Sequence, residues 1–226
     1  MEQFTCSFRD FLTDGSAWLE FVFVSSSVLM LAVYHIHLFF QIRHSPLKTS
    51  VGLTNRLRSD WVRTMMQGRM DIVAVQTLRN WTMAASFLAS TAIFINVGIM
   101  NTAFHTERVP EIAHTLNFMG STCHRLWLIK LLVLIVELFF AFFNFSLSVR
   151  YYNHASLMIN VPVEQDPLNT PEAVVATLNR GALHYMLGMR GYYLAIPFTL
   201  WLFGPTWMLG GTVIMIPVLY KLDRIA

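Results

Sequence analysis

Charged side chains are scarce in this sequence. Only 13% of its 226 residues are Asp, Glu, Lys or Arg, whereas 55% are hydrophobic. Soluble domains carry about 25% charged residues, so the deficit excludes an ordinary water-exposed globular protein. The net charge of +3 at pH 7 is small. The basic residues gather beside an apolar stretch, where anionic lipid headgroups are the expected partners and nucleic acid is not.

Enzyme motifs are also lacking. The sequence has no H-E-x-x-H, no G-x-S-x-G, no P-loop, no dinucleotide fingerprint and no C-x-x-C. Its eight histidines are scattered without the spacing of metal ligands. We therefore expect a protein that is not an enzyme, with no catalytic residue, no metal and no cofactor.

Four long apolar stretches dominate the sequence: 18–41, 82–101, 126–149 and 192–220. Each is long enough for a bilayer core of about 30 Å, which takes about 20 residues at the helical rise. The sequence predicts an all-α, polytopic membrane protein with a four-helix transmembrane bundle in a single domain, 1–226. Prolines and glycines interrupt the last stretch, which is either one kinked span or a re-entrant pair of half-helices, and we favour the kinked span.

The distribution of positive charge predicts the orientation. The link 42–81 holds seven of the sixteen Lys and Arg residues, so it is expected on the cytoplasmic side. The N-terminus and the link 102–125 then lie outside, and 150–191 lies inside. Cys6 and Cys123 fall on the outer side, and whether they form a disulfide stays open. The sequence does not identify the membrane, and the plasma membrane is only the default assumption.

Both inner links carry helical patterns. In the first, apolar residues recur at near-helical spacing from Trp61 to Val75 among arginines, which predicts an amphipathic surface helix leading into the second span. In the second, Thr170 precedes Pro171, the pattern of a capped helix start. We predict a helix over 171–189 there. The fold class thus includes two amphipathic inner-side helices.

Polar residues inside the apolar stretches need an explanation. Lys130, Glu137 and Asn144 fall on one side of the third span. Glu137 is near its midpoint, where a charged acid costs roughly 2.5–3.5 kcal/mol, so it should face protein or water or be protonated. Three interpretations stay open: a structural tie between helices, part of an ion, proton or substrate path, or exposure to lipid in a thinned span. Lys130 is nearer the outer boundary and is expected to snorkel.

A candidate buried polar layer follows from these positions. Alanines line one face of the second span together with Asn96, which predicts close helix packing. His35 ends the first span and is expected to be a buried, hydrogen-bonded histidine. The Gly204-Pro205 break is expected at the depth of Glu137, where transporters place unwound helices. The layer comprises Glu137, Asn144, Lys130, His35 and Asn96.

The string Asp71-Ile-Val-Ala-Val-Gln-Thr-Leu-Arg-Asn80 resembles the plant and bacterial membrane family called domain of unknown function 599. The resemblance continues through Tyr34-His35, Ser146 to Arg150, Gly204-Pro205 and Ile216 to Tyr220, and is closest to plant members. It implies an uncharacterised four-span protein. The family motif transfers onto Gln76, Thr77, Arg79 and Asn80 at the inner boundary, and no catalytic role comes with it.

Two functional hypotheses remain. The first is a non-enzymatic membrane protein that acts by helix association, as an accessory or scaffold subunit. Its expected partners are membrane lipids and either another membrane protein or a second copy of the chain. The alternative is a small transporter or channel that uses the polar layer around Glu137.

Overall fold

The computed structural model describes residues 15–105, 117, 124–162, 166 and 168–224. Cys6 and Cys123 lie outside these residues. Within the described part the chain is helical, without strands. The elements are α2 (Gly15–His44), the 3-10 turn η1 (Pro46–Lys48), α3 (Ser50–Gln67), α4 (Asp71–His105), α6 (His124–Met158), α7 (Pro171–Trp201) and α8 (Pro205–Asp223).

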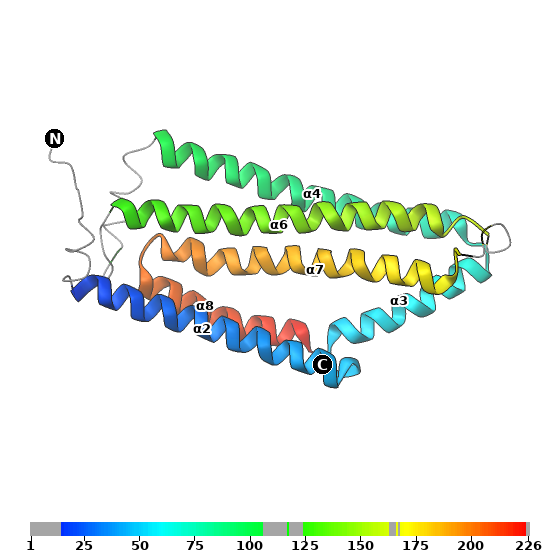
Figure 1. Ribbon diagram of the computed structural model, residues 1–226, viewed down its shortest axis with the longest axis horizontal. Coiled ribbons are helices and arrows are strands. Elements are labelled where there is room, and N and C mark those ends of the chain that lie inside the picture. Colours follow the sequence, from blue (N-terminus) through cyan, green and yellow to red (C-terminus); the bar gives the residue numbers. More distant parts are fainter. Residues whose placement is uncertain (1–14, 106–116, 118–123, 163–165, 167, 225–226) are drawn as a thin grey trace.

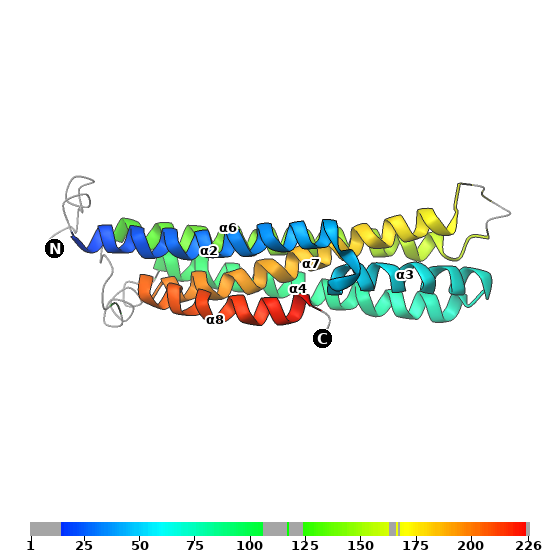
Figure 2. The same ribbon diagram turned by 90° about the horizontal axis from the view of Figure 1, so that it is seen from below.

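Three long antiparallel helices form the frame of the molecule (Figure 1). They are α4, α6 and α7, and α6 lies between the other two. The three helices have 31 to 35 residues, which corresponds to lengths of about 46–52 Å at the helical rise. α2 and α8 lie along one half of this frame, and α3 lies along the other (Figures 1 and 2). We call the α3-covered part, residues 50–81, 150–162 and 168–183, the extension. The remainder is the apolar half.

The extension has an apolar core of its own. Val62 of α3 is fully buried, as are Leu78 of α4 and Leu178 of α7. Trp61 and Met65 pack against the same core, as their spacing predicts. The buried members are Val62, Ala74, Leu78, Tyr152, Ala155, Ile159, Val174 and Leu178. Four helices therefore share one core here, as in a soluble bundle.

The helix predicted from Trp61 to Val75 is two helices. α3 ends at Gln67, and α4 begins at Asp71. Arg69 between them has φ +48°, in the left-handed region that ends helices. Because the chain reverses there, α3 packs beside α4 and α7 instead of continuing into the second span.

A capped start fixes α7 against the end of α6. Thr170 Oγ1 accepts a hydrogen bond from the Ala173 amide at 3.2 Å. The side-chain amide of buried Asn169 donates to the carbonyls of Met158 (2.7 Å) and Val161 (2.9 Å). Together with the bond from the Val161 amide to the Met158 carbonyl, these bonds tie the end of α6 to the segment that precedes α7. The predicted start of this helix is confirmed, but α7 runs on beyond residue 189 to Trp201.

Small residues allow α6 to approach both neighbours closely. A Cβ added at Gly188 of α7 would lie 2.8 Å from the Phe145 ring of α6, and one at Gly191 would lie 3.0 Å from Ala141. On the other side, the predicted small-residue face of α4 is buried, and its Ala89 shares a cluster with Ala141 and Phe145. The tight contacts explain why bulky residues are absent from these positions.

The prediction of one kinked span over 192–220 is wrong. The stretch contains the end of α7 and all of α8, which run antiparallel and are joined by a turn over 202–204 (Figure 1). Gly204 has φ +135°, a conformation that side chains disfavour, and Pro205 opens α8. Leu202 packs against Trp127 near the start of α6. The turn is thus at the end of the bundle and not at the depth of Glu137.

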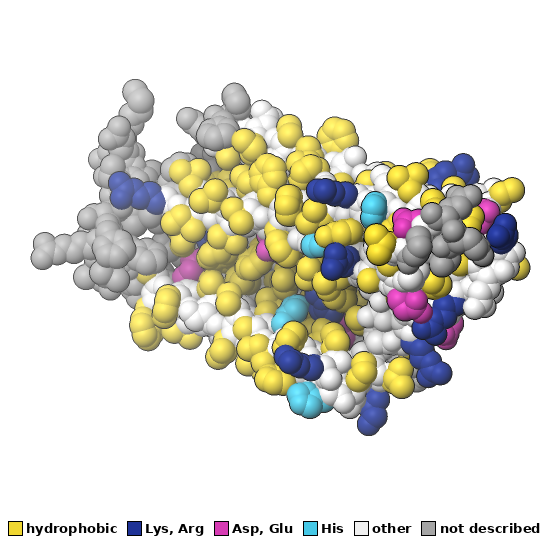
Figure 3. Space-filling view, turned by 45° about the vertical axis from the view of Figure 1, so that its right-hand side comes forward, with side chains coloured by type: hydrophobic (Ala, Val, Ile, Leu, Met, Phe, Trp, Pro, Cys, Tyr) yellow, Lys and Arg dark blue, Asp and Glu magenta, His cyan; other side chains and the backbone are white. Residues whose placement is uncertain are grey.

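Three helices are long and apolar enough to cross a membrane: α2, α4 and α6, over Ala17–His44, Asp71–Ala103 and Arg125–Met158. Large apolar side chains point outward from them, such as Phe87 and Phe94, which are 72% and 76% exposed. Charged side chains gather over the extension, and hydrophobic ones cover much of the rest of this face (Figure 3). This distribution is typical of a protein with one half in lipid.

Candidate functional site

Four helices meet at one level between the apolar half and the extension. The ring of Trp81 on α4 lies 5.6 Å from that of Tyr152 on α6, measured between centroids. Tyr152 in turn lies against the backbone of Gly181 on α7. Arg58 on α3 donates to Oδ1 of Asn179 on α7 at 2.5 Å. These contacts fix the register of the four helices at what we call the junction level.

Positive charge collects at the junction level. Within two residues of those contacts stand five arginines from four helices and a single acid, Asp60. Trp61 adds a third aromatic ring, 5.7 Å from that of Trp81. Tryptophan, tyrosine and arginine are the side chains that favour a membrane–water interface. The arginines are Arg56, Arg58, Arg79, Arg150 and Arg180.

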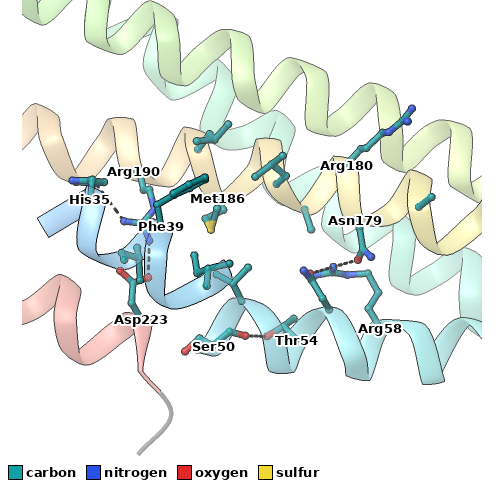
Figure 4. Close-up of a pocket in the computed structure, with 18 residues that line it drawn as sticks. His35, Phe39, Ser50, Thr54, Arg58, Asn179, Arg180, Met186, Arg190 and Asp223 are labelled. Carbon is teal, nitrogen blue, oxygen red and sulfur yellow. Dashed lines mark hydrogen bonds and ion pairs between the residues drawn. The ribbon is translucent and has the colours of Figure 1, made fainter. Parts of the chain in front are cut away.

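A cavity of about 770 Å³ opens beside this level, where α2 gives way to α3 and both face α7 (Figure 4). Its size falls in the range of small-molecule sites, roughly 300–1,000 Å³. Most of its wall is apolar. Phe39 and Leu183 line it and are 59% and 48% exposed, so they stand at its mouth. The apolar wall comprises Leu38, Phe39 and Ile42 of α2, Val51 of α3 and Ala176, Ala182, Leu183, Met186 and Leu187 of α7.

An ion pair closes one end of the cavity. Arg190 Nη2 lies 2.7 Å from Asp223 Oδ1, and the two side chains are only 11% and 13% exposed. The Tyr34 hydroxyl donates to the other carboxylate oxygen of Asp223. His35 Nδ1 donates to the Leu31 carbonyl, which leaves Nε2 as the acceptor facing Arg190 at 3.4 Å. α2, α7 and α8 are thereby tied together.

The other end of the cavity carries a charge without a carboxylate partner among the described residues. Arg58 Nη1 donates to Oδ1 of Asn55 and of Asn179, which are both neutral. Burial lowers the pKa of Arg58 from its ordinary value, but a guanidinium remains charged at neutral pH. Arg180 also lines the cavity, and its guanidinium points away from it (Figure 4). Arg58 is therefore the charge that the cavity presents.

The corner between α3 and α8 is fastened by hydrogen bonds. Ser50 Oγ donates to the Leu222 carbonyl at 2.9 Å, and Thr49 forms an isolated bridge with Arg224. Ser50 and Asp223 both line the cavity. The end of α8 thus holds the start of α3 in place, which keeps this side of the cavity ordered.

A second polar group is buried in the apolar half. Lys130 Nζ of α6 lies 2.6 Å from Glu20 Oε1 of α2, with side chains 4% and 3% exposed. The Trp201 indole of α7 donates to the same oxygen at 2.8 Å. The prediction that Lys130 snorkels is wrong, because Glu20 offers a nearby partner inside the bundle. That partner is over a hundred residues away in sequence.

The remaining members of the predicted polar layer separate into bonded and unbonded groups. Asn144 accepts from His184 of α7 at 2.9 Å and donates to the Phe140 carbonyl. Asn96 is 1% exposed and neither atom of its amide has a hydrogen-bond partner in the described structure. Glu137 is half-buried, and its Oε1 also has no hydrogen-bond partner in the described structure. The structure does not join the five residues into one layer.

Asn96 and Glu137 stand at similar depths on neighbouring helices. Ile99 of α4 packs against the cluster that contains Leu134 and Leu138 of α6, which indicates the antiparallel register there. Asn96 is one turn from Ile99, and Glu137 is adjacent to Leu138. A pair of unsatisfied polar groups at one depth is costly in a dry core and needs a partner, water or protonation.

The motif residues of the inner boundary face outward. Gln76, Arg79 and Asn80 are exposed on α4, and the Thr77 hydroxyl donates to the Val73 carbonyl of its own helix. The structure records no hydrogen bond from the other three side chains. The expected contacts with a neighbouring segment are thus not made within the described chain.

Sequence reasoning singled out His35 from the cavity network but missed the ion pair of Arg190 and Asp223. Tyr34 and His35 belong to a string that resembles the family, but no sequence pattern pointed to Arg190 or Asp223. A single arginine inside a predicted inner helix and an acid in the last turn of the chain are ordinary features of a sequence. Only the antiparallel return of α8 brings them together. Among the described residues, no group of three His, Cys, Asp or Glu side chains is placed to hold a metal ion.

Comparison with known proteins identifies the class. The model of a family described as "Protein of unknown function, DUF599" matches residues 22–226, so this helical chain with three membrane-length helices belongs to that family. The match covers the junction level, the cavity and the outward motif. No curated protein matches, and no solved structure does.

Proposed function

We propose that this protein is a non-enzymatic, multi-pass membrane protein that acts by association, as an accessory or scaffold subunit. The observation that carries this proposal is the extension, which has a four-helix apolar core and continues three helices of the apolar half without a break. Such an arrangement holds a folded platform rigidly against the membrane surface. Its outward residues Gln76, Arg79 and Asn80 offer polar groups to a partner.

The proposed topology has five crossings. α2, α4 and α6 cross along their apolar parts, and the end of α7 and all of α8 form the fourth and fifth passes. The arginines and aromatic rings of the junction level then mark the cytoplasmic boundary. The extension lies in the cytosol, the start of α2 lies outside, and α8 ends inside.

Cysteine accessibility tests this topology. In a chain whose two native cysteines are replaced, Leu168→Cys reports on the extension, where Leu168 is 85% exposed. Thr206→Cys reports on the α7–α8 turn. A membrane-impermeant maleimide added to intact cells should label the second variant and spare the first until the cells are opened. Labelling of Leu168→Cys in intact cells would reverse the orientation.

Mild extraction and purification test the association role. The wild-type chain should co-purify with a partner at fixed stoichiometry, and a triple substitution of Gln76, Arg79 and Asn80 by Ala should release it. Triple substitution of the exposed Arg56, Arg63 and Asn160 is the control and should leave the complex intact. A wild-type chain that purifies alone and monomeric would contradict the proposal.

The unpartnered groups of Asn96 and Glu137 favour a second candidate, a small transporter or channel. A carboxyl group at membrane depth can relay protons or bind a cation. In liposomes, the wild type should then carry a proton or ion flux that Glu137→Gln abolishes, while the exposed Glu172→Gln leaves it unchanged. Liposomes without a wild-type flux would rule this function out.

A further inference from the structure

The geometry points to an anionic phospholipid as the ligand of the cavity between α2, α3 and α7, with its phosphate on Arg58 and its acyl chains along the apolar wall. This inference is independent of the scaffold role, because it concerns a bound molecule and not a protein partner.

The charge of the cavity selects an anion. Asp223, the carboxylate in the lining, is already paired with Arg190. Arg58 faces two side-chain amides and keeps its charge uncompensated. A guanidinium presents a planar fork of donors that suits phosphate oxygens, and a partly buried site strengthens such a bond. Asn55 and Asn179 also carry NH₂ donors that can reach a headgroup.

The shape of the cavity selects an amphiphile over a free anion. Eight apolar side chains of α2 and α7 line the cavity together with Arg58 and Arg190. Phe39 and Leu183 stand exposed at the mouth, so the cavity opens onto the apolar side surface of the bundle. A molecule with a phosphate at the junction level and hydrocarbon toward the apolar half would satisfy both regions. An inorganic phosphate has no hydrocarbon and would make no favourable contact with the apolar wall.

The position of the cavity agrees with this occupant. It lies beside the junction level, where arginines from four helices and the rings of Trp61 and Trp81 gather, and such side chains mark the depth of headgroup phosphates in a bilayer. The bonds from Ser50 to Leu222 and from Arg190 to Asp223 hold its walls in place without a ligand. A preformed site loses little conformational entropy on binding.

Native mass spectrometry of the detergent-purified chain tests the proposal. Dioleoyl phosphatidylglycerol should bind about tenfold more tightly than dioleoyl phosphatidylcholine, the scale of one charge-assisted contact. Arg58→Gln removes the positive charge but keeps an NH₂ donor for Asn179. It should abolish the preference for phosphatidylglycerol over phosphatidylcholine. The matched control is Arg56→Gln on the same helix, which removes the same charge outside the cavity and should leave the preference intact.

A second variant tests the apolar wall. Ala182 lines the cavity, and Ala182→Trp fills it without changing any charge. It should weaken phosphatidylglycerol binding about tenfold while the melting temperature of the lipid-free protein stays within a few degrees of wild type. The same melting test establishes that Arg58→Gln is folded.

Four results would overturn the inference. Equal binding of the two lipids would remove the anion requirement, and equal losses from Arg56→Gln and Arg58→Gln would indicate a diffuse basic surface. Displacement of phosphatidylglycerol by millimolar inorganic phosphate would identify a site for a free anion. Retention of full binding in Ala182→Trp would place the lipid outside the cavity.

Discussion

At the scale of single residues, the ion pair of Glu20 and Lys130 joins α2 to α6 inside the apolar half. Both side chains are almost fully buried, and the Trp201 indole supplies a further hydrogen bond to the carboxylate. The net stabilisation from such a pair is small, because burying two charges costs about as much as their attraction returns. Removing one partner is different, since it leaves the other charge buried alone.

Glu20→Gln should therefore destabilise the protein by about 3–5 kcal/mol, because the Lys130 ammonium loses its counter-charge. Thermal unfolding in detergent measures this effect. The double variant Glu20→Gln, Lys130→Met removes the stranded charge and should recover most of the loss. A single variant as stable as wild type would show that the pair is not buried as described.

The glycines of α7 give a second prediction at this scale. A methyl group at Gly188 would lie 2.8 Å from the Phe145 ring, so Gly188→Ala should cost about 1–3 kcal/mol of stability. Gly98→Ala is the matched control, since an added Cβ there meets nothing within 4 Å. It removes a helix-interior glycine and should be neutral or stabilise by up to about 1 kcal/mol. Equal effects of the two substitutions would contradict the close packing.

At the scale of elements, the contact between the end of α6 and the start of α7 decides how the extension closes. Asn169 spans the gap by bonding two carbonyls of the preceding segment while Thr170 caps the following helix. One short segment thereby satisfies backbone groups on both helices. The two helices are held at the spacing that the extension core requires.

Asn169→Ala should destabilise the protein by about 1–3 kcal/mol, because the Val161 carbonyl loses the Asn169 donor and the Met158 carbonyl keeps only the Val161 amide. The loss should be local, so hydrogen exchange should speed up in the last turn of α6 and the first turns of α7, with little change in α2 and α8. Asn160→Ala is the control. The amide of Asn160 bonds only the Ser156 carbonyl of its own helix and is exposed, and little change is expected.

At the scale of the whole molecule, α4, α6 and α7 run through both parts without interruption. The apolar half and the extension share their frame, but each has separate buried clusters. α3 belongs only to the extension, and α2 and α8 belong only to the apolar half. The cavity lies where these two sets of shorter helices meet.

Leu178 tests the independence of the extension core. Leu178→Ala should cost about 2–5 kcal/mol, because the side chain is fully buried among four helices. Limited proteolysis should then cut the extension sooner, while the apolar half stays protected by detergent. Leu168→Ala, at an 85% exposed position, should have no measurable effect. Unchanged proteolysis of Leu178→Ala would contradict the extension core.

The sequence by itself determined the class of structure and the contents of its helices. Apolar length predicted helices where α2, α4 and α6 lie, and the capped start at Pro171 is the start of α7, whereas the last apolar stretch and the arginine-rich link each hold parts of two helices. The inward face of α6 and the small-residue face of α4 followed from helical periodicity. These features depend only on residues within a few turns of one another.

Tertiary structure alone decided how the helices pair. A glycine with φ +135° turns the last apolar stretch back on itself, and this reversal brings Asp223 to Arg190. Lys130 is buried because Glu20, more than a hundred residues earlier, arrives beside it. The cavity exists because α2 stops where α3 begins and both face α7. Contacts between distant segments depend on the path of the whole chain, and no local pattern encodes that path.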